Sequence, residues 1–300
     1  MLKMYHQNPH SGDTPDYWAN SWEDIGFEDA LKLCSNDPLL PLFDKYINRE
    51  SLILEGGCGK GHWVAYFREK GYKIVGLDFA QRTLAELNNN RPGLSLCGGN
   101  VNMLPFADGT FDVYYSGGVV EHFEDGCEEA LSEARRVLKP NGTLLLSVPY
   151  YSPLRRILTP VRRDSWRRLA APEVDSTTFA NGLTYFQYAY RISEFQKMLT
   201  AAKLETIETM GYSVIWGLYD LKFLNDRARQ KNLARRANQT STDFTVQNID
   251  DSGDGGRSAP SLLKELLIGE DVSTTFKAAT TNLMRWASAN MMMFVCKKTR

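Results

Sequence analysis

The sequence is poor in the features that mark secreted, metal-binding and membrane-spanning proteins. Its five cysteines are scattered, form no Cys-x-x-Cys pair and stand near no histidine pair, which argues against a disulfide framework and a structural zinc site. They are Cys34, Cys58, Cys97, Cys127 and Cys296. No apolar run approaches the roughly 18 residues that a membrane-spanning helix needs, and the first residues lack the apolar stretch of a signal peptide. We therefore expect a soluble, cytoplasmic protein without a bound metal.

Neither charge is in excess, and no segment repeats. The 35 Lys and Arg residues nearly balance the 36 Asp and Glu residues, which gives a net charge of −1. A near-neutral total gives no general reason to expect a nucleic-acid partner. Apolar residues, by contrast, make up 43% of the 300 residues, which suffices for a substantial core in one large or two modest domains.

Between about residues 50 and 150, short β-rich segments alternate with helical patterns. The pattern predicts strands over 51–56, 73–79, 94–100, 110–118 and 143–151, and helices over 62–71, 81–90 and 128–142. This alternation is typical of a parallel, doubly wound sheet, so we predict an α/β fold. A helix over 192–203, a strand over 204–212 and a last buried strand over 290–298 are expected after it.

Changes in composition divide the chain into six segments. We predict an N-terminal helical cap (1–48), a core (49–150), an Arg-rich lid insertion (151–190), a segment with a helix, a sixth strand and a basic amphipathic stretch (191–239), a mobile linker (240–260), and C-terminal helices with the last strand (261–300). Long insertions of this kind are common sites of functional loops.

The stretch ILEGGCGKGH, residues 53–62, places a glycine-rich turn directly after the first core strand. Such a turn, leading into a helix, favours close backbone contact with a nucleotide-type ligand. The spacing does not fit a dinucleotide fingerprint, because His62 stands where the last glycine should be, and it does not fit a P-loop, because Leu54 stands at the first glycine position. It fits acidic-x-Gly-x-Gly-x-Gly, formed by Glu55, Gly57, Gly59 and Gly61.

Three further motifs follow in order: VGLDF at 75–79, GGNVNMLPF at 98–106 and FDVYYSGGVVEHF at 111–123. Together with the glycine-rich turn and EARRVLKPNGTLLLSVP at 133–149, they resemble the class I S-adenosylmethionine (SAM) dependent methyltransferases. This resemblance covers about residues 50–150 and implies a Rossmann-like, seven-stranded, mostly parallel sheet with helices on both faces and SAM as the cofactor. S-adenosylhomocysteine (SAH) would be its product.

The resemblance also implies roles for individual residues. Glu55 and the glycines would hold the methionine part of SAM, Asp78 the ribose hydroxyls, and Phe79 the adenine. Asn100 stands where the family often has an aspartate that accepts from the adenine amine, and it keeps an acceptor oxygen. The cofactor residues expected in this way are Glu55, Gly57, Gly59, Gly61, Asp78, Phe79, Asn100, Val101, Ser116 and Gly117.

The N-terminal aromatic residues Tyr17, Trp18 and Trp22 resemble segments that close over SAM in similar methyltransferases, although ordinary core packing is an equal alternative.

A hydroxyl or ammonium acceptor needs a base, for which His122 is the first candidate, followed by Tyr150 and Tyr151. The alternative is that Glu121 and His122 cap the following helix and brace the turn.

The fourth strand is followed by SGGVVEH, not by the Asn/Asp-Pro-Pro-aromatic motif of amino-methylating nucleic-acid enzymes, so we expect a small-molecule acceptor methylated at O or N. Two basic stretches, 154–168 and 221–236, suit an anionic membrane surface, an anionic or lipid-linked substrate, or simply solvent. The alternative functions are a non-catalytic SAM-binding scaffold, and a methyltransferase whose macromolecular substrate docks on the arginine-rich lid.

Overall fold

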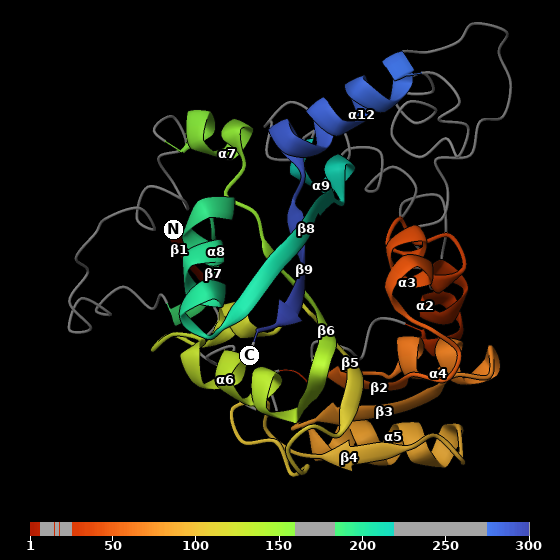
Figure 1. Ribbon diagram of the computed structural model, residues 1–300. Helices are drawn as coiled ribbons and strands as arrows, with labels where there is room; N and C mark the ends of the chain where they lie inside the picture. Colours follow the sequence, from red (N-terminus) through yellow and green to blue (C-terminus); the bar gives the residue numbers. More distant parts are fainter. Residues whose placement is uncertain (7–14, 16–17, 19–25, 160–183, 219–274, 300) are drawn as a thin grey trace, which may run out of the picture.

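The computed structural model describes residues 1–6, 15, 18, 26–159, 184–218 and 275–299 (Figure 1). The predicted linker over 240–260, most of the Arg-rich lid, the whole of the second basic stretch, and Tyr17 and Trp22 lie outside the described residues. Within the described part, the predicted α/β architecture is present and positions one cavity that concerns the function.

A seven-stranded sheet forms the centre of the molecule, in the order β4-β3-β2-β5-β6-β9-β8. Its strands are β2 (Leu52–Gly56), β3 (Lys73–Asp78), β4 (Leu96–Gly98), β5 (Phe111–Gly117), β6 (Leu138–Pro149), β8 (Leu204–Tyr212) and β9 (Met291–Lys298). Strands β2 to β6 pair in parallel, and only β9 runs antiparallel to its neighbours β6 and β8. This sheet confirms the predicted seven-stranded, mostly parallel, Rossmann-like fold.

Helices cover both faces of the sheet (Figure 1). One face packs against α2 (Phe27–Cys34), α3 (Leu40–Tyr46), α4 (His62–Glu69) and α5 (Gln81–Asn90), and the other against α6 (Glu128–Val137) and α8 (Ile192–Ala201). Alternate residues of a strand serve the two cores: in β6, Leu144 and Leu146 belong to one and Leu145 to the other. Because both faces are buried, this strand appears in the sequence as a continuous apolar run.

The helix predicted over 128–142 ends earlier, at Val137, and β6 begins at Leu138. Pro140 disfavours helical backbone at the residue before it, so the helix does not extend through Pro140, Asn141 and Gly142 to the predicted end at residue 142. Leu138 already has extended dihedral angles, φ −73° and ψ 135°.

The predicted N-terminal helical cap differs from the structure at its start. Residues Leu2–His6 form strand β1, which pairs antiparallel with β7 (Thr184–Ala189) in a separate two-stranded sheet. The helices α2 and α3 of the cap are present. A strand of five residues carries little local signal, and its partner lies far along the chain, so the sequence pattern could not reveal this pairing.

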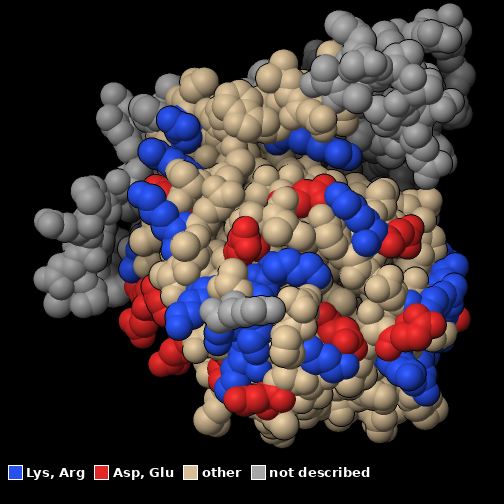
Figure 2. Space-filling model, in the orientation of Figure 1, with Lys and Arg blue, Asp and Glu red and all other residues tan. Residues whose placement is uncertain are grey.

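Three further helices, α7 (Pro153–Leu158), α9 (Val214–Leu218) and α12 (Thr275–Ser288), gather beyond one end of the sheet (Figure 1). Figure 2 shows Lys and Arg interspersed with Asp and Glu on the face that it presents. Among the residues that the structure describes, no helix is both long and apolar enough to cross a bilayer.

Candidate functional site

A cavity of about 390 Å³ lies at the carboxyl ends of the parallel strands, where open α/β sheets bind their ligands. The ends of β2, β3 and β5 form its floor, and the segments that follow β4 and β5 form its sides. Of the predicted site residues, the structure brings nine together here: Trp18, Glu55, Gly57, Asp78, Phe79, Asn100, Val101, Gly117 and His122.

The glycine-rich turn serves the cavity and the packing beneath it in different ways. Gly57 lines the cavity with φ +76°, and a Cβ atom there would lie 2.3 Å from Val119 Cγ2. Gly61, also with positive φ, caps the start of α4, and a Cβ there would lie 2.4 Å from Leu87 Cδ2. Glycine is therefore required at both positions, by backbone conformation and by space, but only Gly57 touches the cavity.

Asp78, at the end of β3, is fixed by two backbone amides. Its Oδ2 accepts from the Gly59 N–H at 2.7 Å, and its Oδ1 accepts from the Ala80 N–H at 2.9 Å. A carboxylate offers about four acceptor sites, so each oxygen can accept one more hydrogen bond from a ligand. Gly59 thus acts from behind the carboxylate and does not itself line the cavity.

Glu55, at the end of β2, is a carboxyl whose ionised form is disfavoured by its surroundings. It is buried, and its Oε2 has no hydrogen-bond partner among the described residues. Burial raises the pKa of this carboxyl well above its usual range, and the nearby charge of Asp78 raises it further. A cationic ligand group would supply the missing partner.

The end of β3 and the segment after β4 form a largely apolar side of the cavity. Leu77, Phe79 and Val101 line it together with Asn100. The Asn100 Oδ1 accepts from the Asn102 N–H at 2.9 Å. This short turn holds the Asn100 side chain in place and leaves its amide NH₂ group available as a donor.

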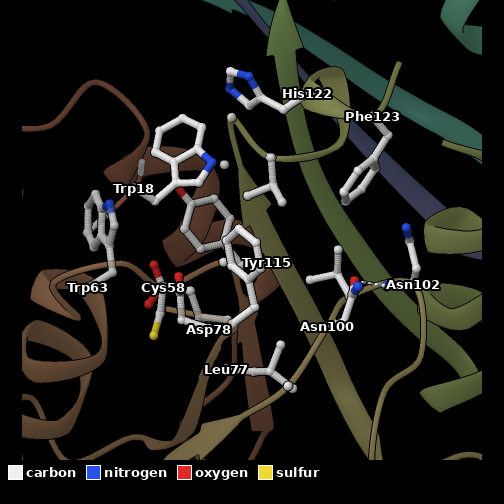
Figure 3. Close-up of a pocket in the computed structure, with 18 of the residues that line it drawn as sticks. Trp18, Cys58, Trp63, Leu77, Asp78, Asn100, Asn102, Tyr115, His122 and Phe123 are labelled. Carbon is white, nitrogen blue, oxygen red and sulfur yellow. Dashed lines mark hydrogen bonds between the residues drawn. The ribbon is translucent and has the colours of Figure 1, made fainter. Parts of the chain in front are cut away.

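Aromatic side chains surround the opposite end (Figure 3). The rings of Trp18 and His122 meet edge to face with 4.7 Å between centroids, and Tyr115 and Phe123 line the same region. His122 Nδ1 lies 2.7 Å from the carbonyl oxygen of Phe186. Since a carbonyl only accepts, Nδ1 carries the ring proton and Nε2 carries the lone pair.

Strand β7 holds the loop that bears His122. The Tyr185 hydroxyl donates to the carbonyl of Glu121 at 2.5 Å, and the Tyr188 hydroxyl donates to the carbonyl of Glu124 at 3.0 Å. Together with the Phe186 carbonyl, these bonds fix the backbone and the ring orientation at this end of the cavity.

The other predicted residues that the structure describes do not line the cavity. Ser116 is buried and donates to the Gly56 carbonyl at 2.9 Å, which supports the floor from below. Tyr150 is buried, and burial raises the pKa of its phenol. Tyr151 donates to Thr159 Oγ1 at 3.3 Å. Gly61 belongs to the helix packing described above, as Gly59 belongs to the support of Asp78.

Ten further residues of the cavity wall were not predicted from the sequence. These are Cys58, His62, Trp63, Leu77, Gly99, Asn102, Tyr115, Gly118, Val119 and Phe123. Most are immediate neighbours of predicted residues, so motif position alone could have indicated them. Burial lowers the pKa of His62 to about 4, which leaves this imidazole uncharged at neutral pH. Among the described residues, no cluster of His, Cys, Asp or Glu could hold a metal ion.

The segment that forms most of the cavity is similar to known methyltransferases. Residues 54–146 match the family model described as "Methyltransferase domain". A "Probable S-adenosylmethionine-dependent methyltransferase" of Mycolicibacterium smegmatis is 34% identical over 125 residues, which cover 41% of this chain and 48% of the relative. A malonyl-acyl-carrier-protein O-methyltransferase of Pectobacterium atrosepticum is 30% identical over 114 residues, which cover 38% and 44%. The chain thus spans about half the length of the curated relatives it matches.

Among solved structures, a phosphoethanolamine N-methyltransferase 2 of Haemonchus contortus, in complex with phosphomonomethylethanolamine and SAH, has a similar fold. The TM-score is 0.52 at 13% identity, and the match covers 95% of this chain and 60% of that chain. At this level of identity the likeness concerns the fold alone.

Proposed function

We propose that this chain, whose residues 54–146 form a methyltransferase domain of the class I SAM-dependent kind, transfers a methyl group from SAM to an O or N atom of a small molecule. The observation that carries the proposal is the buried Glu55 oxygen without a partner among the described residues, in a cavity that Asp78 at the end of the neighbouring strand also lines. A dinucleotide or a triphosphate would bring negative charge to this place, where two carboxylates already repel. SAM instead carries an ammonium group.

The residues present fit SAM along the whole cavity. Glu55 and the backbone at Gly57 would receive its amino-acid part, and Asp78 would accept from the ribose hydroxyls. Phe79, Leu77 and Val101 provide apolar contacts for the adenine, beside the polar group of Asn100. Ser116 would support the floor through its hydrogen bond to the Gly56 carbonyl, and Gly117 would form part of the wall around the cofactor. Tyr17 and Trp22 stay predictions.

When bound, SAM supplies a methyl group on a positively charged sulfur. Positive charge disperses during such a transfer, so orientation within a partly dry pocket can supply most of the catalysis. Trp18, Tyr115 and Phe123 would exclude water from the acceptor, and aromatic faces also stabilise a nearby cation. His122 would accept a proton at Nε2, because its Nδ1 proton is committed to the Phe186 carbonyl. Tyr150 and Tyr151, which lie outside the cavity wall, are the weaker candidates for this base.

Titration calorimetry of the whole chain with SAH and SAM tests the cofactor part of the proposal. Release of SAH from SAM in the presence of a library of hydroxyl and amine compounds tests the reaction. We expect binding of both nucleosides and acceptor-dependent SAH release. Absence of SAH binding would overturn the proposal, and binding without turnover of any acceptor would favour the non-catalytic scaffold instead.

Methylation at oxygen is supported by one group of relatives, the malonyl-acyl-carrier-protein O-methyltransferases, which align with the core of this chain. An anionic or lipid-linked acceptor and a macromolecule docked on the arginine-rich lid stay as alternatives. Most of that lid lies outside the described residues. Binding to anionic liposomes or RNA that weakens strongly with salt would favour them.

A further inference from the structure

We infer that the acceptor is an amine with an apolar body, and that carboxylates and phosphates are rejected at the His122 end of the cavity. This inference rests on the proposed function, because it names the substrate class of the same site. Three features of the described residues support it: the aromatic walls, the sign of the charges around the cavity, and a buried carboxyl behind Gly118.

The walls at this end favour an apolar body. Trp18, Tyr115, His122 and Phe123 line it (Figure 3), and Trp63 lies beyond Trp18. Tyr115 and His122 are both buried, at 6% exposure, so the surrounding structure holds their rings in place at the cavity wall. Aromatic faces attract ammonium groups and gain nothing from anions.

Among the described residues that line the cavity, the acidic side chains have no basic Lys or Arg counterpart. Glu55 and Asp78 line it, and no Lys or Arg is found among the described lining residues. His62 does not offset them, because burial holds its pKa at about 4. Of the described arginines of the predicted lid, Arg155 donates to the Tyr150 carbonyl at 2.9 Å and to Asn290, and Arg156 is exposed. Neither lines the cavity.

A third carboxyl, that of Glu121, lies immediately behind the wall. It is 2% exposed, and its Oε2 has no hydrogen-bond partner among the described residues. Its Oε1 lies 4.0 Å from His122 Nε2 and 3.5 Å from the point where a Cβ of Gly118 would stand. Gly118 lines the cavity and has no side chain, so the Glu121 carboxyl lies close to the backbone of the cavity wall.

Burial raises the pKa of Glu121 to about 8, and burial together with the charge of Asp78 raises that of Glu55 well above its usual range. An ammonium group that approaches such a carboxyl favours its ionised form and becomes its partner, whereas an anion opposes that ionisation and gains no partner. An amine would enter as its ammonium form and give one N–H proton to His122 Nε2. Its nitrogen lone pair would then form the new bond to the methyl carbon as the sulfur–carbon bond of SAM breaks, leaving a neutral thioether. Glu121, 4.0 Å from Nε2, would stabilise the imidazolium and is therefore a positioning residue.

Matched probes test the inference without a known substrate. Phenethylamine, 2-phenylethanol and phenylacetate share an aromatic body and differ in charge. We expect the SAH-saturated protein to bind phenethylamine at least tenfold more tightly than phenylacetate, which is about 1.4 kcal/mol, with the alcohol between them. Equal or tighter binding of phenylacetate, or no binding of the amine, overturns the inference. Binding of SAH itself is measured first, so failure of the proposed function is seen separately.

The variant Glu121→Gln tests the source of the preference. We expect it to retain SAH binding and to reduce the preference for phenethylamine over phenylacetate at least threefold. The matched control is Asp125→Asn, which removes an exposed carboxyl from the same loop and should leave the preference unchanged. Nitrogen-15 NMR of His122 in the SAH complex gives a second readout. A glutamate that can ionise beside the ring favours the imidazolium and a glutamine cannot, so the variant should have the lower imidazole pKa. An unchanged preference in Glu121→Gln together with an unchanged His122 titration overturns the role given to Glu121.

Discussion

Replacement of Glu55 by glutamine should have opposite effects on stability and on binding. The carboxyl is buried, lacks a partner for one oxygen and has a pKa raised well above its usual range. Unfolding lets it ionise in water, so the wild-type protein loses stability as pH rises from the ordinary glutamate pKa towards the raised value. The glutamine amide cannot ionise, and we therefore expect Glu55→Gln to have the higher melting temperature at neutral pH.

The same change should weaken cofactor binding. A hydrogen bond to a charged partner contributes about 1.5–3 kcal/mol, so the dissociation constant of SAH should rise roughly 10- to 150-fold. Wild-type affinity should also rise with pH as Glu55 ionises, because the ammonium of the ligand pairs with the carboxylate. The variant should lack this dependence.

Calorimetry for SAH affinity and scanning calorimetry for melting, both across a pH series, measure the two effects. Glu50→Gln is the matched control, because Glu50 is exposed just before β2 and neither quantity should change there. SAH affinity within twofold of wild type in Glu55→Gln would refute the assignment of Glu55 to the ligand's ammonium. A lower melting temperature would show that the carboxylate is stabilised by a partner in the folded protein.

Three further changes probe other parts of the cavity. Gly57→Ala should destabilise the fold by about 1–3 kcal/mol in urea unfolding, because the backbone has φ +76° and the added Cβ would collide with Val119. Adding Val119→Ala should recover part of the lost stability. An unchanged unfolding midpoint in the single variant would contradict this reasoning. Asp78→Asn should weaken adenosine binding about tenfold or more by calorimetry and leave methionine binding alone, and equal losses for both ligands would place the ribose elsewhere. His122→Asn should lower the rate of SAH release with an amine acceptor roughly 10²- to 10⁴-fold while SAH still binds, and a normal rate would remove His122 as the base.

The parts of the site that one short stretch encodes could be predicted from sequence. In ILEGGCGKGH the apolar strand, the acidic residue at its end and the glycine turn are contiguous, so Glu55 and Gly57 could be placed without knowledge of the fold. Asp78 could be placed because it ends the next strand, and parallel strands end at one edge of the sheet. The parallel α/β sheet could be predicted from the alternation of strands and helices, and its seven strands from the family resemblance.

The sequence did not show which of two neighbouring strand residues faces the cavity, because that depends on how the strand is oriented in the sheet. Tyr114 and Tyr115 are neighbours in β5 and therefore point to opposite faces: Tyr114 belongs to the core with α6, whereas Tyr115 lines the cavity. Nothing in the two letters distinguishes them. The burial of Glu121 could not be predicted either, since the sequence suggested only that it caps the following helix and braces the turn.

Contacts between distant segments could not be predicted at all. Phe186 holds His122 from a strand 64 positions later in the chain, and that strand is itself paired with Leu2–His6. The hydroxyls of Tyr185 and Tyr188 have no motif to mark them. Such pairings depend on the folded arrangement of both partners, which local patterns do not contain.

The pairing of β1 with β7 links the beginning of the chain to the chemistry of the cavity rim. Lys3 forms an ion pair with Glu124 at 2.6 Å, and the carbonyl of the same glutamate accepts from the Tyr188 hydroxyl. Substitutions that break the pairing of Leu2–His6 with β7 would therefore disturb the ribbon that orients the imidazole, although the two segments lie far apart in sequence.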